Sequence, residues 1–231
     1  MNVATPNFAQ QLSALVMKDL RSELRTREIL TTTLMFPLVL LLVFRFAFEV
    51  GDTVGVRAAA PGVIWASALL SSILSLTRSF SSEREDDRIH GLLLAPVDRG
   101  TIYLAKLLAN LAFLFLVEAV TIAAFGVFFA IDLGPALPKL LPVIALGTIG
   151  ISAVGTLFSA MAVNTRARES LLPLLLFPVL TPILLAVLEH TRVGLAGGAE
   201  AIEGHWLGSL IAFDVIFVAA GWMLFEYVVE E

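Results

Sequence analysis

Six long apolar stretches dominate this sequence of 231 residues and determine the environment in which it can fold. A helix needs about 20 mainly apolar residues to cross a hydrocarbon core of ~30 Å. Hydrophobic residues make up 58% of the chain and charged residues 15%, against roughly 45–50% and about 25% in soluble domains. Lipid must solvate this excess. The predicted spans are residues 29–50, 58–78, 103–130, 140–163, 170–189 and 206–228.

Helices are the form expected for these spans, because open strands leave backbone groups unpaired in lipid. The sequence also lacks the ~10-residue alternating segments of a membrane barrel. We therefore predict an all-α, polytopic membrane protein with six transmembrane helices. By length the chain fits one domain, residues 1–231.

The segment before the first span, residues 8–28, predicts an additional helix. Its apolar residues recur at helical spacing, with basic residues among the polar positions. Such a helix can lie in the cytoplasmic headgroup layer, its basic groups near anionic lipid. The alternative is an ordinary amphipathic helix packed on a soluble partner. The apolar positions are Phe8, Leu12, Leu15, Val16, Leu20 and Leu24, and the basic ones Lys18, Arg21 and Arg25.

The distribution of Lys and Arg predicts the orientation in the membrane. Basic residues gather before the first span and in the second-to-third and fourth-to-fifth loops. The other side carries only Arg57, Lys139 and Arg192. Because cytoplasmic loops are enriched in Lys and Arg, both termini are predicted to lie in the cytoplasm, at the inner membrane. The basic residues on the cytoplasmic side are Lys18, Arg21, Arg25, Arg27, Arg78, Arg84, Arg88, Arg99, Lys106, Arg166 and Arg168.

The loop at 79–102 is much longer than a connection requires. It combines a charge cluster at 83–88 with an apolar triplet and a proline, which is typical of a short surface helix. A solvated charge run is the alternative, but apolar side chains exposed between charges favour a contact with another protein. The predicted contact residues are Glu83, Glu85, Gly91, Leu92, Leu93, Leu94 and Pro96.

Small residues and prolines mark three of the spans. Small residues at helical spacing let helices approach closely, or form a surface on which helices glide. Each proline in the fifth span removes a backbone donor, so a kinked or partly broken helix, and a candidate hinge for gating, is expected there. The packing residues are Ser67, Ser71, Ser75, Gly147, Gly150 and Gly155, and the prolines are Pro173, Pro178 and Pro182.

Glu118 lies near the middle of the third predicted span, and Asp214 lies within the outer half of the sixth. A charge at the centre of a membrane costs ~2.5–3.5 kcal/mol or more, so such residues are functional candidates. Glu118 is interpreted as a protonated packing group or as part of a polar transport path. Neither alternative is excluded by the sequence.

Several chemistries have no residues to support them. The sequence lacks the G-x-x-x-x-G-K-[ST] motif that cradles ATP phosphates. It has no cysteine, and no set of residues indicates catalysis, a metal site or a nucleic-acid partner. We expect a protein that is not itself an enzyme.

Four segments resemble one known family, the permease subunit of the bacterial cytochrome c maturation ABC transporter, or haem exporter protein B. The similarity includes the Pro-Gly-x-x-Trp pattern at Pro61, Gly62 and Trp65. It extends over nearly the whole chain but departs at Asp87, where glycine is common, and at His90, often acidic. The segments are Ala60–Asn110, Lys18–Glu28, Gly147–Val163 and Glu169–Val187.

The resemblance implies a six-helix permease that pairs with a second copy and with cytoplasmic ABC ATPase subunits. It also implies a haem-handling membrane subunit and a small accessory subunit as partners. ATP would then act through the ATPase partner, gripping the loop at Glu83 to Pro96. Haem would be a transported or handled ligand. Energy coupling is preferred over direct carriage of haem, because no intramembrane His, Cys or Tyr is arranged as an evident axial ligand. The ATP-driven step would serve haem delivery or release of the haem-loaded periplasmic chaperone. An exporter permease for a lipid, drug or polysaccharide is the alternative, and a purely structural membrane anchor is another.

Overall fold

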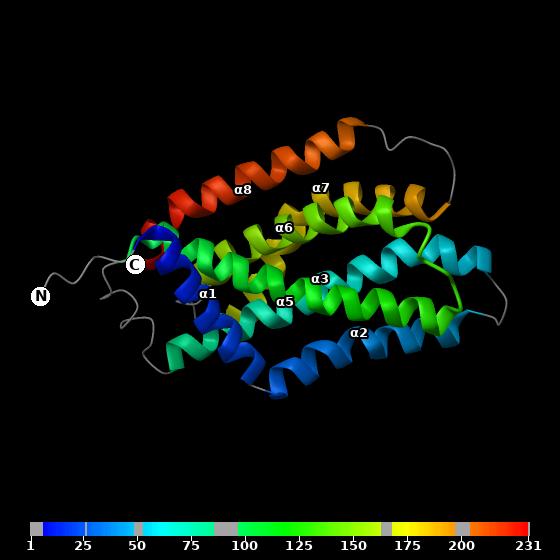
Figure 1. The fold of residues 1–231 in the computed structure, drawn as a ribbon, viewed down its shortest axis with the longest axis horizontal. Coiled ribbons are helices and arrows are strands. Elements are labelled where there is room, and N and C mark those ends of the chain that lie inside the picture. The colour runs from blue at the N-terminus through cyan, green and yellow to red at the C-terminus, as the bar shows by residue number, and fades with distance from the viewer. Residues whose placement is uncertain are drawn as a thin grey trace, which may run out of the picture.

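The described part of the chain is entirely helical apart from short connections, as predicted. The computed structural model describes residues 7–25, 27–48, 53–85, 97–162, 168–196 and 204–230. The helices, labelled in Figure 1, are α1 (Phe8–Arg25), α2 (Arg27–Ala47), α3 (Thr53–Glu85), α5 (Arg99–Phe129), α6 (Leu137–Ala162), α7 (Arg168–Ala196) and α8 (Gly204–Glu230).

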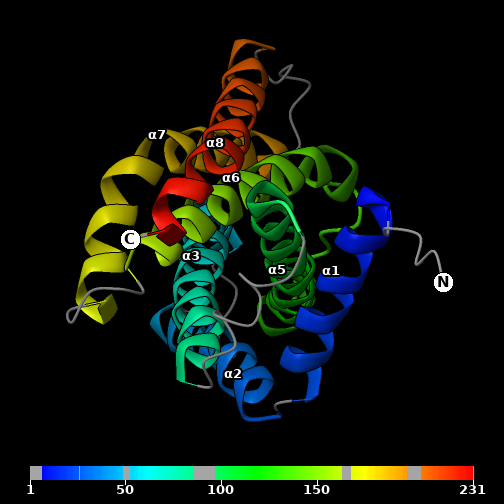
Figure 2. The same cartoon turned by 90° about the vertical axis from the view of Figure 1, so that its left-hand side faces the viewer.

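The helices from α2 to α8 form a bundle in which successive helices run in opposite directions (Figure 1). The helix α1 slants across one end of this bundle and packs against α5. The view along the bundle in Figure 2 places α6 among its neighbours. It packs against α3, α5, α7 and α8. The remaining helix of the bundle, α2, packs on α3 and α5.

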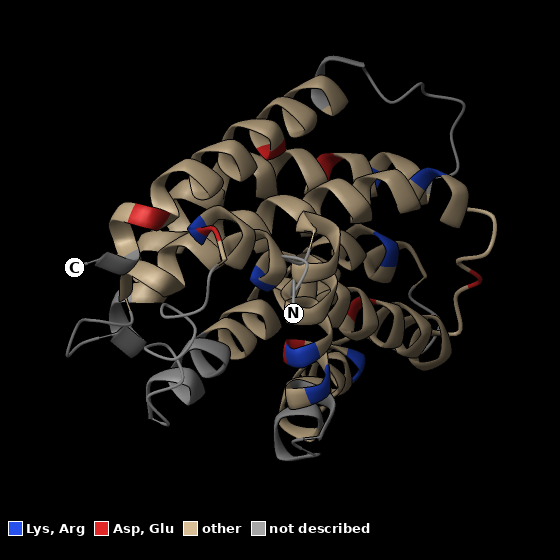
Figure 3. Cartoon of the chain, turned by 60° about the vertical axis from the view of Figure 1, so that its left-hand side comes forward, with Lys and Arg blue, Asp and Glu red and all other residues tan. Residues whose placement is uncertain are grey.

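Five of these helices are long and apolar enough to cross a membrane, which makes the chain a multi-pass membrane protein. Positions of charged residues, coloured blue and red in Figure 3, are sparse along the described bundle. In α2 the apolar stretch among the described residues, Thr31–Ala47, is shorter than in the other five. Five of the six predicted spans therefore coincide with helices that are long and apolar enough to cross a membrane. The five are Thr53–Leu76, Arg99–Phe129, Leu137–Ala162, Leu172–Leu195 and Leu207–Val228.

The two ends of α5 are defined by local hydrogen bonds. Asp98 is the N-cap, and its carboxylate accepts from the Thr101 N–H at 3.3 Å, as short polar side chains do before a first helical turn. At the other end Ala130 adopts a left-handed conformation, with φ 52° and ψ 40°. That backbone reversal ends the helix, and residues 131–136 lead directly into α6.

The helix α7 is not broken at its three prolines. A kinked or partly broken helix was expected at Pro173, Pro178 and Pro182, and α7 is one continuous helix through all three. A kink or hinge at these positions stays a prediction. Pro178 and Pro182 lie on the exposed side of the helix, and Pro173 is half-buried. Membrane helices tolerate proline because local adjustments satisfy the freed backbone groups.

Candidate functional site

The most buried acidic group in the bundle is Glu118 of α5, 5% exposed. Its two carboxyl oxygens lie 2.8 and 2.7 Å from Thr148 Oγ1 of α6. The same hydroxyl lies 2.7 Å from the Ile144 carbonyl oxygen. One hydroxyl hydrogen cannot serve three acceptors. The Thr148 hydroxyl therefore joins the Glu118 carboxyl to the backbone of α6.

A second buried acid, Asp214 of α8, lies on another side of α6 and is 6% exposed. Within the described residues neither of its carboxyl oxygens has a hydrogen-bond partner. Its Oδ1 approaches Gly150 so closely that a Cβ built there would lie 2.8 Å away. The middle of α6 is thus contacted by one acid with a partner, at Thr148, and one without, at Gly150.

The first turns of α5 make several polar contacts with neighbouring helices. Tyr103 is fully buried, and its hydroxyl lies 3.1 Å from the Ala153 carbonyl oxygen of α6. Ser152 Oγ donates to the Leu107 carbonyl at 3.2 Å. These contacts hold the start of α5 against the second half of α6.

Two further contacts extend this region. Asn110 Nδ2 donates to Thr156 Oγ1 at 3.1 Å, joining α5 to α6 again. Lys106, also on α5, is 4% exposed, and its Nζ lies 3.9 Å from Asp19 Oδ2 of α1. The ion pair ties α1 to the same part of α5.

The small residues predicted to mediate packing are all buried in the structure. Ser67, Ser71 and Ser75 are 0–2% exposed on α3, and Ser67 Oγ donates to the Val63 carbonyl of its own helix at 2.7 Å. The three glycines of α6 lie at close contacts with other helices: Gly147 against Trp65 and Val187, Gly150 against Ile183 and Asp214, and Gly155 against Leu76.

The predicted contact surface in the loop is only partly placed by the structure. Glu83 and Glu85 lie in the last turn of α3, but their side chains are not described. Gly91, the Leu92–Leu94 triplet and Pro96 lie outside the described residues. Their role in binding a partner stays a prediction.

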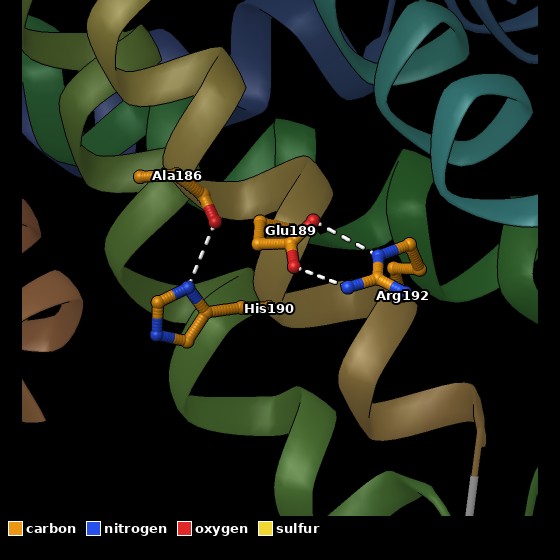
Figure 4. A network of polar contacts seen from close by, with 4 residues as sticks. All are labelled: Ala186, Glu189, His190 and Arg192. Carbon is orange, nitrogen blue, oxygen red and sulfur yellow. Dashed lines mark hydrogen bonds and ion pairs between the residues drawn. The ribbon is translucent and has the colours of Figure 1, made fainter. Parts of the chain in front are cut away.

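The end of α7 carries the polar contacts drawn in Figure 4. Arg192 Nε donates to Glu189 Oε2 at 2.9 Å, and its Nη2 pairs with Oε1. The His190 ring points away from this pair and is 2% exposed. Its Nδ1 donates to the Ala186 carbonyl at 2.8 Å. Within the described ranges no group of three or more His, Cys, Asp or Glu residues could hold a metal ion.

Comparison with known proteins identifies the family. A family model described as "CcmB protein" matches residues 10–224, from the first helix into the last. The chain belongs to the CcmB family. Similar proteins named "Heme exporter protein B" include one from Paracoccus denitrificans, 34% identical over 187 residues that cover 80% of this chain and 84% of that protein. Another, from Pseudomonas aeruginosa, is 30% identical over 216 residues, 90% of this chain and 95% of that protein.

A third relative of this CcmB family chain, also named "Heme exporter protein B", is from Rhodobacter capsulatus. It is 30% identical over 207 residues, covering 90% of this chain and 94% of that protein. Because the similarity extends along almost the full length, it includes both α1 and the bundle. The family resemblance inferred from the sequence is confirmed.

Sequence reasoning missed several residues that hold the CcmB bundle together. Thr148, the partner of Glu118, is one hydroxyl among many in apolar spans. Tyr103 was placed at a span boundary, where tyrosine is common. Asn110 did carry a signal, because an amide inside a membrane helix needs a hydrogen-bond partner. The ion pair of Lys106 with Asp19 could not be inferred without knowing that α1 folds onto α5.

Proposed function

We propose that this chain is the membrane-embedded permease of an ATP-driven ABC transporter complex that handles haem in cytochrome c maturation. The observation that carries this proposal is the CcmB family match over residues 10–224. Relatives at 30–34% identity over most of the chain are named heme exporters. A multi-pass helical bundle is the fold that such a permease requires.

The permease is proposed to have six spans, with α2 as the first. α2 has 21 residues, about 32 Å at ~1.5 Å per residue, which is enough to cross the core. α1 would lie at the membrane surface. Its Phe8 and Met17 are exposed, whereas Asp19 is buried toward α5.

The end of the bundle that carries α1 is proposed to face the cytoplasm, as do both termini. The basic residues of α1 and of the start of α5 support this orientation. At the same end α3 finishes and α5 begins (Figure 1), so segment 86–98 would be presented to cytoplasmic proteins.

The chain has no motif for binding ATP phosphates, so a partner subunit must hydrolyse ATP. We propose that the surface contacted by that ATPase consists of Glu83, Glu85, Gly91, the triplet Leu92–Leu94 and Pro96. Polar contacts would come from the two glutamates and apolar contacts from the leucines. Two copies of the chain would pair in the membrane, beside a haem-handling subunit and a small accessory subunit.

The work of the permease is proposed to be energy coupling rather than direct carriage of haem. ATP-driven movement of the bundle would release the haem-loaded periplasmic chaperone. The close packing of the described core supports this, because Gly147, Gly150 and Gly155 of α6 all lie at close contacts with neighbouring helices.

A double charge reversal tests the proposal. Glu83→Lys with Glu85→Lys should reduce co-purification of the ATPase subunit and stimulation of its activity, because both polar contacts become repulsive. The matched control is Glu226→Lys, exposed near the same end on α8. If the ATPase subunit binds the double variant normally and its activity is stimulated normally, as with the control, this surface is excluded as the ATPase contact.

A further inference from the structure

Two helices adjoin the proposed ATPase contact surface in sequence: α3, whose last turn carries Glu83 and Glu85, and α5. Asp98, the N-cap of α5, follows Pro96 by two residues. A force that the ATPase applies at this surface would therefore act on the first turns of α5. The helices to which these turns are fixed determine which part of the bundle moves with them.

They are fixed first to the C-terminal half of α8, by two glycines. Gly100 of α5 lies against the Trp222 indole of α8, which would overlap with any Cβ at position 100. Gly221 of α8 lies against the Tyr103 ring in the same way. Each helix thus offers a glycine to an aromatic side chain of the other, and the two interlock.

Tyr103 also joins three helices through one hydroxyl. Its oxygen lies 3.1 Å from the Ala153 carbonyl of α6 and 3.4 Å from the Phe217 carbonyl of α8. A single O–H is therefore placed between two backbone acceptors on different helices. The ring packs on Phe225 of α8, with centroids 5.7 Å apart.

Contacts one to two turns further along α5 reinforce the same connection. Ser152 and Thr156 of α6 bond to the Leu107 carbonyl and to Asn110. Aromatic packing, glycine contacts and hydrogen bonds therefore all join residues 99–110 to α6 and α8. Because these contacts differ in kind and direction, they resist both sliding and rotation of α5 against α6 and α8.

We propose that residues 99–110 of α5, the second half of α6 and the C-terminal half of α8 move as one rigid block when the ATPase partner acts on the permease. Tyr103 is the positioning residue of this block. The inference rests on the proposed function, because it takes segment 86–96 to be where the motor acts. It adds the route by which the movement reaches α6.

A reversible cross-link tests the rigidity. The chain contains no cysteine, so Gly100→Cys with Trp222→Cys creates two thiols that a short bis-methanethiosulfonate reagent can bridge. In the assembled complex, the bridged protein should mature cytochrome c at the same rate as the same double variant after reduction. Mass spectrometry confirms the bridge. A bridged protein that is inactive while its reduced form works would overturn the proposal.

A conservative variant tests the positioning role. Tyr103→Phe keeps the ring on Gly221 but removes the hydroxyl. It should raise the amount of ATP hydrolysed per mature cytochrome, because a hydrogen bond that fixes α5 to α6 and α8 is lost, while ATPase co-purification stays normal. The control is Tyr227→Phe, 70% exposed on α8.

Failure of the proposed function and failure of the rigid block give different results. If the wild-type chain does not co-purify with an ATPase at all, the proposed function fails. If docking is normal but Tyr103→Phe leaves the ratio of ATP to cytochrome unchanged, the proposed function stands and the rigid block is refuted. A lower yield of folded protein at an unchanged ratio would count against positioning as well.

Discussion

The helices α6 and α8 have equal mean hydropathy in their apolar spans, yet they occupy opposite situations in the bundle. In the most apolar 18-residue stretch, 72% of the residues of α6 are buried against 17% of those of α8. Hydropathy therefore identifies a span but not its place. The small residues differ: α6 meets four other helices and brings Gly147, Gly150 and Gly155 to close contacts. In α8 a Cβ built at Gly208 meets no described atom within 4 Å, and only Gly221, near the end of the helix, lies at a close contact, with Tyr103.

The largest effect is expected when a central glycine is filled. Gly150→Leu would drive a side chain into Ile183 and Asp214, and overpacking of this kind costs about 3 kcal/mol or more. Gly208→Leu should be close to neutral, since the space there is open. Reversible unfolding in mixed micelles measures both. Equal losses of stability would show that the two helices do not differ as described.

A smaller effect is expected at the partnered acid. Thr148→Val leaves Glu118 buried without its hydroxyl partner, which should cost about 2 kcal/mol. Thr181→Val is the matched control, because Thr181 is exposed on α7 and donates only to the Phe177 carbonyl of its own helix. The same unfolding assay applies. If Thr148→Val leaves the free energy of unfolding unchanged, the contact of Thr148 with Glu118 does not contribute to stability.

The smallest effect, and one of opposite sign, is expected at the unpartnered acid. Asp214→Val removes a buried carboxyl that has no hydrogen bond within the described chain, so stability should rise by about 1 kcal/mol. Cytochrome maturation by the same variant is the second measurement. Marked destabilisation would mean that Asp214 has a partner in the folded protein. Lost maturation in a stabilised protein would make Asp214 a functional group.

Much of the fold could be predicted because the bilayer restricts it. The stretch at 103–130 became Arg99–Phe129, and the amphipathic segment at 8–28 became Phe8–Arg25. Length and hydropathy determine such elements locally. Of the two alternatives predicted for α7, the partly broken helix is not found, because Pro178 and Pro182 sit on the exposed side of a continuous helix.

The candidate site could be predicted only in part. Glu118 stands out in the sequence because a carboxyl is costly in lipid. Its partner Thr148 is 30 residues away, and the contact of Tyr103 with Phe217 spans 114 residues. Such pairs depend on which helices become neighbours and on their rotation about their axes, which hydropathy does not specify.

The short connection between α5 and α6 has a consequence for how the chain enters the membrane. These two helices follow one another during synthesis, and Glu118, Leu107 and Asn110 find their partners on α6 alone. A hairpin of α5 and α6 can therefore enter the membrane with these polar groups already hydrogen-bonded to each other. Asp214 is made later, on the last helix, and must enter lipid without such help.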